Sequence, residues 1–200
     1  MNKRKDKREL ITKIAKTFFQ RYGYGKTSLD DIAREAFIGK GTIYYYFESK
    51  EEIFFHIAEI QLEKMDAKLE LIFDDTDNYE EFLKNVIMRP LELIADIDSV
   101  VFDVKNTLRS THAKKLEEIE QRFEDTICGK FKRAINIGID RDIIAKDTDV
   151  QHLSVAILEV LYSIDHAQGK CSADIKQEVQ LIIPYIRTVV DYLVKGILCK

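Results

Sequence analysis

The amino-acid sequence predicts an all-α fold, and three observations lead to this prediction. Only two prolines and eight glycines occur in 200 residues, which leaves little material for the frequent turns of a β protein. Apolar residues recur at intervals of three and four along most of the chain, as one face of an α-helix requires. Capping boxes, in which an acidic residue follows a hydroxyl residue three positions later, begin at either Thr27 or Ser28 and again at Ser49.

The first fifty residues predict three helices. Apolar positions over residues 10–19 form the stripe of a first helix, and the glycines in residues 22–25 end it. A short second helix starts at Thr27 and Ser28. A third begins near Gly39 and runs through Tyr46. Two short helices joined by a tight turn are typical of a helix-turn-helix.

The rest of the chain also predicts helices. A long helix at about residues 49–73 joins this three-helix head directly to a C-terminal body, and an acidic loop follows at 74–78. Pro90 and Pro184 lie inside apolar periodic segments, so each is expected to kink or interrupt its helix. The later helices are expected at 79–96, 99–110, 112–137, 149–168 and 173–197.

Charge is divided unevenly between the two parts. Residues 1–50 hold twelve Lys or Arg and six Asp or Glu, a net charge of +6, whereas the remaining residues carry −10. A basic head on an acidic body suits phosphate binding by the head. We therefore expect a helix-turn-helix domain at 1–48 and a helical domain at 49–200.

Patterns for catalysis, metal binding or a cofactor are missing from the sequence. The three cysteines are widely spaced without a CxxC pair, and the histidines lack metal-ligand spacing. No phosphate loop, GxSxG motif or catalytic pair of carboxylates occurs. The sequence thus predicts neither an enzyme nor a protein with a cofactor or metal.

The location expected from the sequence is the cytoplasm. The polar start of the chain does not read as a signal peptide. The most apolar stretch, residues 179–198, is interrupted by Arg187, Asp191 and Lys195 at helical intervals, which a membrane span rarely tolerates.

The most informative segment is 27–52, which reads TSLDDIAREAFIGKGTIYYYFESKEE. Ile43 and Phe47 are four positions apart, so they share the inward face of the third helix. Tyrosine hydroxyls and a lysine on the outer face suit contacts to DNA phosphates and bases. The residues left on that face are Lys40, Thr42, Tyr44 and Tyr45.

This segment resembles the DNA-binding head of the TetR/AcrR family of bacterial repressors. The residues that carry the resemblance are Thr27-Ser28, Asp31-Ile32-Ala33, Lys40-Gly41-Thr42-Ile43-Tyr44-Tyr45-Tyr46-Phe47 and Ser49-Lys50-Glu51-Glu52. It covers about the first 55 residues, and beyond them only the length and the number of helices agree with the family.

The resemblance implies a role in binding double-stranded DNA for nine residues. Thr27 and Lys50 would bind phosphates, and Ser28 would cap a helix or add a phosphate contact. The other six lie in the recognition helix. Thr42 and Tyr46 would assist on the backbone, Lys40, Gly41 and Tyr44 would face base edges, and Tyr45 would reach either.

Two positions depart from the family pattern. Phe37 stands where the turn usually has glycine, and Gly39 stands where serine is frequent. Either the turn glycine has shifted along the chain, or Phe37 packs into the core of the head.

The last two predicted helices are apolar over more than one face, which indicates burial by the core and by a second subunit. Two central helices of a monomer would give the same pattern. The residues expected at a homodimer interface are Leu153, Ile157, Leu161, Ile182, Ile186, Val190 and Leu193.

The resemblance further implies a repressor that a small-molecule effector releases from a palindromic operator. The effector would enter the body and move the fourth helix. Candidate contacts, where polar groups interrupt apolar helices, are Phe102, Arg109, His112, Tyr162 and His166. Each of them also fits an ordinary core or interface residue. The alternatives are a body that binds a protein partner, and an activator or architectural protein.

Overall fold

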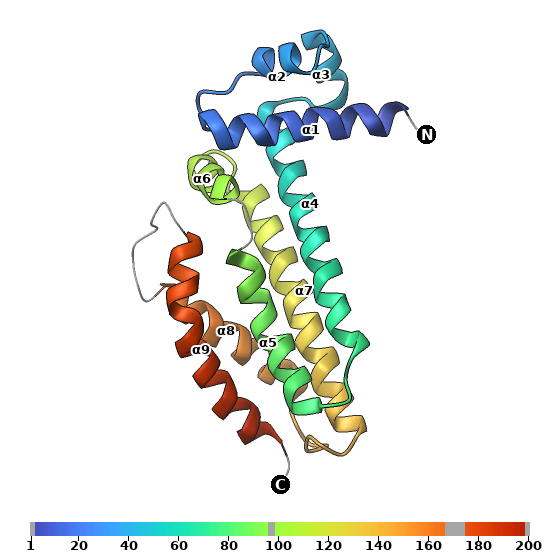
Figure 1. The fold of residues 1–200 in the computed structure, drawn as a ribbon, viewed down its shortest axis with the longest axis vertical. Coiled ribbons are helices and arrows are strands. Elements are labelled where there is room, and N and C mark those ends of the chain that lie inside the picture. Colours follow the sequence, from blue (N-terminus) through green and yellow to red (C-terminus); the bar gives the residue numbers. More distant parts are fainter. Residues whose placement is uncertain (1–2, 96–98, 167–174, 199–200) are drawn as a thin grey trace. The chain divides into compact units, whose positions relative to one another are not determined.

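The computed structural model describes residues 3–95, 99–166 and 175–198. Every regular element in these ranges is a helix, which confirms the all-α prediction (Figure 1). The elements are α1 (Lys3–Tyr22), α2 (Leu29–Glu35), α3 (Lys40–Tyr46), α4 (Lys50–Glu70), the 3₁₀ helix η1 (Leu71–Asp74), α5 (Tyr79–Ala95), α6 (Ser99–Leu108), α7 (Ala113–Asp140), α8 (Val150–His166) and α9 (Ile175–Ile197).

The chain divides into two compact units. Unit 1 comprises Met1–Leu62 and Asp98–Leu116, and unit 2 comprises Glu63–Ile97 and Glu117–Lys200. Unit 1 extends beyond the predicted boundary at residue 48, because the first turns of α4 bury Ile53 and Phe54.

In unit 1, α2 contacts both α1 and α3. The predicted stripe of α1 is buried at Ile11, Ala15 and Phe19. The helix ends where Gly23 takes a positive φ of 83°, a left-handed conformation that favours glycine. The Gly23 N–H donates to the Phe19 carbonyl at 3.0 Å, which caps the end of α1.

Helix α6 also belongs to unit 1, although unit 2 contains the segments on either side of it in the sequence. It contacts α1 and buries Val104 and Leu108. The sequence predicted this helix but gave no sign that it packs against the head.

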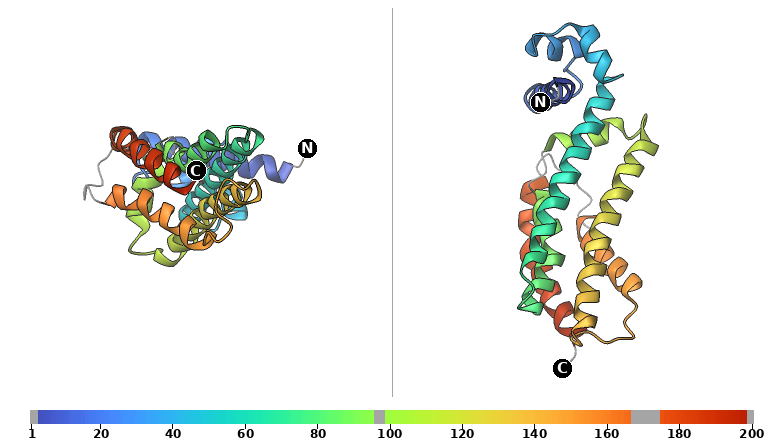
Figure 2. Two further views of the ribbon diagram at one scale, coloured as in Figure 1. Left: turned by 90° about the horizontal axis from the view of Figure 1, so that it is seen from below. Right: turned by 90° about the vertical axis from the view of Figure 1, so that its right-hand side faces the viewer.

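Unit 2 has its own apolar core, to which α5, α7, α8 and α9 contribute, and α5 and α9 lie side by side (Figure 2). The buried Lys130 ammonium forms ion pairs with Asp66, at 2.7 Å, and with Glu70. Together with Arg133, which pairs with Glu70 at 2.7 Å, it fixes the last turns of α4 to α7. A buried cation is costly without such partners.

The two prolines do not interrupt their helices. Pro90 lies inside α5 and Pro184 inside α9, and both helices continue past them. The expected interruption therefore does not occur at either site, and the kink, which was the other expected outcome, stays a prediction. Apolar side chains beyond each proline, such as Leu91 and Ile186, are buried in the protein, which favours continuing the helix despite one lost backbone hydrogen bond.

Among the described residues, no helix is both long enough and apolar enough to cross a membrane.

Candidate DNA-binding site

Helices α2 and α3 are held by a small set of buried side chains. Ile32 and Ala33 of α2 are buried, as are Ile43 of α3 and Phe47 at its end. This confirms that Ile43 and Phe47 face inward. Since these apolar anchors fix α3 along one side, the other side is free to carry polar groups.

The outer side of α3 is exposed and rich in aromatic hydroxyls. Tyr44 and Tyr45 are 50% and 63% exposed, and Lys40 is exposed at the start of the helix. Gly41 is also exposed, and a Cβ built on it would meet no atom within 4 Å. Thr42 and Tyr46 are partly buried, with the Tyr45 and Tyr46 rings 5.0 Å apart. Of the six residues predicted on α3, four therefore lie on one exposed surface of the helix, and Thr42 and Tyr46 lie at its edge.

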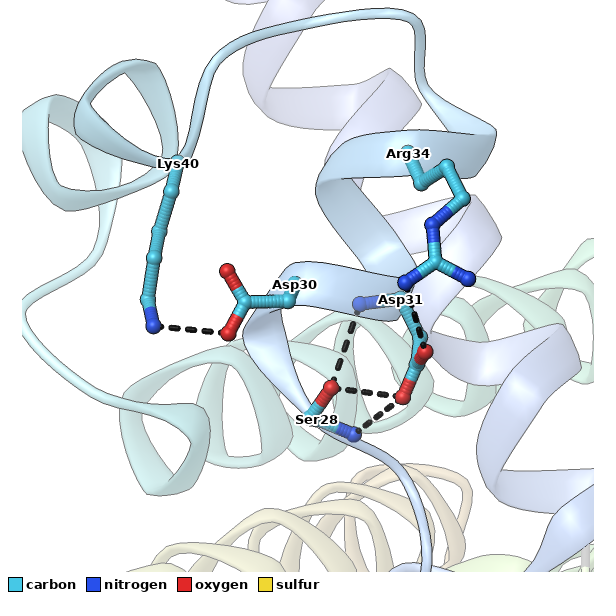
Figure 3. A network of polar contacts seen from close by, with 5 residues as sticks. All are labelled: Ser28, Asp30, Asp31, Arg34 and Lys40. Atoms are coloured by element: carbon cyan, nitrogen blue, oxygen red, sulfur yellow. Dashed lines mark hydrogen bonds and ion pairs between the residues drawn. The ribbon is translucent and has the colours of Figure 1, made fainter.

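A network of polar contacts surrounds the start of α2 (Figure 3). The Ser28 hydroxyl accepts from the Asp31 N–H at 3.2 Å, and the Ser28 N–H donates to the Asp31 carboxylate at 3.1 Å. This is the capping box that the sequence predicts, and the hydrogen bonds from Ser28 lower the pKa of Asp31. Arg34 lies 3.6 Å from Asp31.

The same network holds the cation of α3. Lys40 Nζ donates to Asp30 Oδ2 at 2.7 Å, which links the start of α3 to α2 (Figure 3). The hydrogen bond and charge of Asp30 raise the pKa of Lys40. The sequence placed Lys40 on the outer face but gave no sign of this carboxylate partner.

Lys50 lies under the loop that connects α1 to α2. Its Nζ donates to the carbonyls of Tyr24, at 2.8 Å, and Thr27, at 2.9 Å. The ammonium is also 4.1 Å from the centre of the Tyr24 ring, a cation–π contact. Partial burial lowers the pKa of Lys50. An ammonium has three donors, so one is left for a further acceptor.

Thr27 has a structural role in the same loop. Its side chain is buried, its hydroxyl donates to the Gly23 carbonyl at 2.9 Å, and its N–H donates to the Tyr24 carbonyl at 3.2 Å. Both donors are therefore used within the loop. The phosphate contact expected of Thr27 stays a prediction, and it requires one of these bonds to be exchanged.

Phe37 occupies the turn between α2 and α3 and is 94% exposed. The expectation that it packs into the core of the head is therefore wrong. Its φ is +53°, so the turn keeps the left-handed conformation that glycine adopts at little cost. For a residue with a side chain this conformation costs about 1–2 kcal/mol. The helix then starts at Lys40, with Gly39 at the N-cap and no side-chain hydrogen bond there.

Only two of the five residues expected around an effector, Arg109 and His112, have side chains that the structure describes, so this site stays a prediction. Arg109 is exposed, and the His112 ring lies 5.8 Å from the Phe55 ring, with both residues in unit 1. The other three expected contacts have side chains that lie outside the described residues. They are Phe102, Tyr162 and His166.

Four of the residues expected at a dimer interface are used in the core of unit 2. Ile157, Leu161, Ile186 and Val190 are buried in the protomer itself, and the other three, Leu153, Ile182 and Leu193, are partly buried against the same core. Among the side chains of α9 that the structure describes, from residue 180 onward, the large apolar ones that are exposed are different residues. They are Leu181, Tyr185, Val189 and Tyr192, which we call the α9 stripe.

A short helix that is anchored inward and exposes a cation and phenols, packed on a second short helix, is the architecture of a helix-turn-helix DNA-binding regulator. Residues 11–57 match the family of bacterial regulatory proteins named tetR. Over these residues the chain is similar to the DNA-binding head of this family of transcriptional regulators.

Two relatives and a solved structure are similar to larger parts of the chain. The chain is 26% identical over 159 residues to the HTH-type transcriptional regulator YhgD of Bacillus subtilis, which covers 80% of this chain and 82% of the relative. It is 28% identical over 164 residues to IcaR of Staphylococcus epidermidis, a negative transcriptional regulator of the biofilm operon icaADBC, with 78% and 82% covered. A TetR transcription regulator from Haloarcula marismortui has the same fold, with a TM-score of 0.72, 16% identity, and 98% and 100% of the two chains covered.

Proposed function

We propose that this chain is a dimeric repressor that binds a palindromic operator through α3 and is released by a small-molecule effector. The observation that carries the proposal is the exposed face of α3, where Lys40, Tyr44 and Tyr45 surround a glycine without side-chain cover. A net charge of +6 in residues 1–50 favours the approach of this face to DNA. Repression is supported by the likeness to IcaR.

The residues of the head divide into two roles. Lys40, Gly41 and Tyr44 face base edges in the major groove, with Gly41 allowing close approach of the helix. Lys50 offers its third donor to a phosphate and keeps the other two on the loop carbonyls. Contacts to the DNA backbone come from Ser28, Thr42 and Tyr46, and Tyr45 reaches either the backbone or the bases.

Dimerisation takes place through the α9 stripe. Positions 181, 185, 189 and 192 lie on one face of a helix, opposite the buried Ile186 and Val190. Exposed apolar side chains at this density mark a protein contact, and a second copy of the same helix supplies an apolar partner. A two-fold dimer presents two copies of α3, so its operator is an inverted repeat.

The test of DNA binding is selection from a random duplex library with the full-length chain, followed by fluorescence anisotropy on the enriched sequence. We expect enrichment of an inverted repeat, with affinity that falls steeply as salt concentration rises. Recovery of sequences without a shared repeat would contradict the proposal.

The effector requires a separate measurement. Release from the operator means that effector binding at one site lowers the DNA affinity at another, so both binding events have to be followed. A panel of metabolites is screened for those that raise the melting temperature of the full chain. Each stabilising compound is then added to the complex with the enriched operator. A compound that stabilises the chain and lowers its operator affinity supports the proposal. If no compound does both, a body that binds a protein partner becomes the better explanation.

A further inference from the structure

Phe37 is the most exposed of the large apolar residues in the described part of the chain. It lies in the helix-turn-helix turn, three positions before Lys40, the first residue of α3. A fully solvated phenyl ring contributes nothing to the core, and the positive φ of Phe37 is a backbone conformation that a glycine would adopt more easily. The folded state of unit 1 therefore gains nothing visible from a phenylalanine here.

The backbone of the turn is held independently of the ring. The N–H of Phe37 donates to the Arg34 carbonyl at 3.2 Å, and the N–H of Ile38 donates to the Ala33 carbonyl at 3.0 Å. Both bonds use main-chain atoms, which any residue at position 37 supplies. The ring is thus carried outward on a fixed turn, next to the helix that presents Lys40 and Tyr44.

We infer that Phe37 is a further DNA-contacting residue, whose ring packs against a thymine methyl group at the edge of the half-site read by α3. This inference rests on the proposed function. Bases offer few apolar groups in the major groove, and the C5-methyl of thymine is the one that aliphatic and aromatic side chains contact. The ring adds to the exposed lysine and phenols of α3 an aromatic side chain without a polar group.

Two observations favour DNA over a protein partner on Phe37: the turn is continuous with α3, and the head carries a net positive charge. The turn directly precedes the recognition helix, so a macromolecule on α3 reaches Phe37 without a second surface. The head as a whole carries a net charge of +6 over residues 1–50, and the neighbouring exposed groups on α3 include donors suited to phosphates and base edges. An apolar protein partner would be expected to find further aliphatic side chains beside the ring. In α2, the turn and α3, the other large apolar residues that are exposed are Tyr44 and Tyr45, which carry hydroxyls, and none is aliphatic.

The inference is tested by repeating the library selection with full-length wild type, Phe37→Gly and Phe37→Ala. Phe37→Gly removes the ring and relaxes the backbone, so the melting temperature should rise by about 2–4 °C while operator affinity falls about tenfold. Phe37→Ala removes the ring but keeps a side chain at positive φ, so affinity should fall equally with little gain in melting temperature. A structural role would move affinity and stability in the same direction.

The thymine contact is tested by replacing each thymine of the enriched operator with deoxyuridine in turn. One position per half-site should lose about fourfold in affinity with wild type, the value expected for one buried methyl group, and nothing with Phe37→Gly. Equal affinity and sequence preference of Phe37→Gly and wild type would overturn this inference alone. The absence of any position sensitive to deoxyuridine would do so as well. If wild type enriches no sequence, the proposed function fails and the inference fails with it.

Discussion

Helices α3 and α9 both expose aromatic side chains, but the residues next to those side chains differ. On α3, Tyr44 and Tyr45 lie on the same helix as a lysine and an exposed glycine. On α9, Tyr185 and Tyr192 alternate with leucine and valine along a single stripe. Phenols beside cations suit a charged, hydrogen-bonding partner, whereas phenols beside aliphatic groups suit an apolar one. Exposed tyrosines alone therefore do not distinguish the two surfaces, and the neighbouring side chains indicate the kind of partner that each surface suits.

The largest effect is expected from placing charge on the α9 stripe. Leu181 and Tyr185 are 71% and 74% exposed, so Leu181→Glu with Tyr185→Glu should leave the protomer folded. The dimer should dissociate, and operator affinity should fall by about 100-fold or more, because two linked half-sites no longer bind together. Light scattering on the eluting protein measures the oligomeric state. Gln180→Glu, on an exposed residue outside the stripe, is the control, and a dimeric double variant with full affinity would refute this interface.

A methyl group on Gly138 is expected to destabilise unit 2 without touching the DNA-binding surface. Its Cβ would collide with the Tyr79 hydroxyl and approach Ile144 to 2.9 Å. That tyrosine is buried and donates to the Ala134 carbonyl at 2.8 Å, so it has little room to move. Gly138→Ala should lower the free energy of unfolding by about 1–3 kcal/mol in chemical denaturation.

The control for Gly138→Ala lies in the same helix. Gly129 is exposed, and a Cβ there meets no atom within 4 Å. Gly129→Ala should be neutral or stabilising, since alanine favours the helix by about 0.5–1 kcal/mol over glycine. Equal stabilities of the two variants would show that the packing around Tyr79 adapts without cost.

Gly41→Ala should lower operator affinity without lowering stability, whereas Gly138→Ala should lower stability alone. The added methyl group meets nothing in unit 1, so the melting temperature should stay the same or rise. Operator affinity should fall by about tenfold if α3 approaches base edges at this position, a loss typical of one disrupted base contact. Anisotropy on the enriched operator measures the loss, and unchanged affinity would remove Gly41 from the base-facing set.

The smallest effect is expected from Asp30→Asn. The Asp30 carboxylate holds Lys40 Nζ at 2.7 Å and places a negative charge beside the cation of α3. Removing that charge should raise DNA affinity about two- to fivefold and steepen the dependence of log affinity on log salt by up to about one. Both groups are solvent-exposed, so the melting temperature should change little. Weaker binding by Asp30→Asn would mean that the ion pair positions Lys40 for DNA.

Local signals predicted the helices closely. The expected helices at 79–96 and 99–110 are α5 (Tyr79–Ala95) and α6 (Ser99–Leu108), because caps and apolar periodicity are encoded within a few residues. The start of α2 was equally well marked, and its capping box forms between Ser28 and Asp31.

Features that depend on distant contacts could not be predicted in this way. The carbonyls of Tyr24 and Thr27 accept from a lysine more than twenty positions away, and nothing in the segment reveals that pairing. On α9 the sequence showed apolar residues on several sides, but only packing decides that Ile186 faces the core and Tyr185 faces outward. The turn residue Phe37 is a similar case, because an apolar residue in a predicted helix-turn-helix is ordinarily expected to be buried.

The packing of α6 in unit 1 determines which residues must be transferred if the head is fused to another protein. The chain passes between the units at residues 62–63, 97–98 and 116–117, so unit 1 is completed by a segment taken from the middle of the sequence. A chimera that grafts residues 1–62 onto a foreign body would lack α6 and would leave the face of α1 that contacts α6 open to water. A domain exchange in this protein therefore has to transfer residues 98–116 together with the head. The helix-turn-helix motif is one contiguous segment of the sequence, but the compact unit that contains it is not.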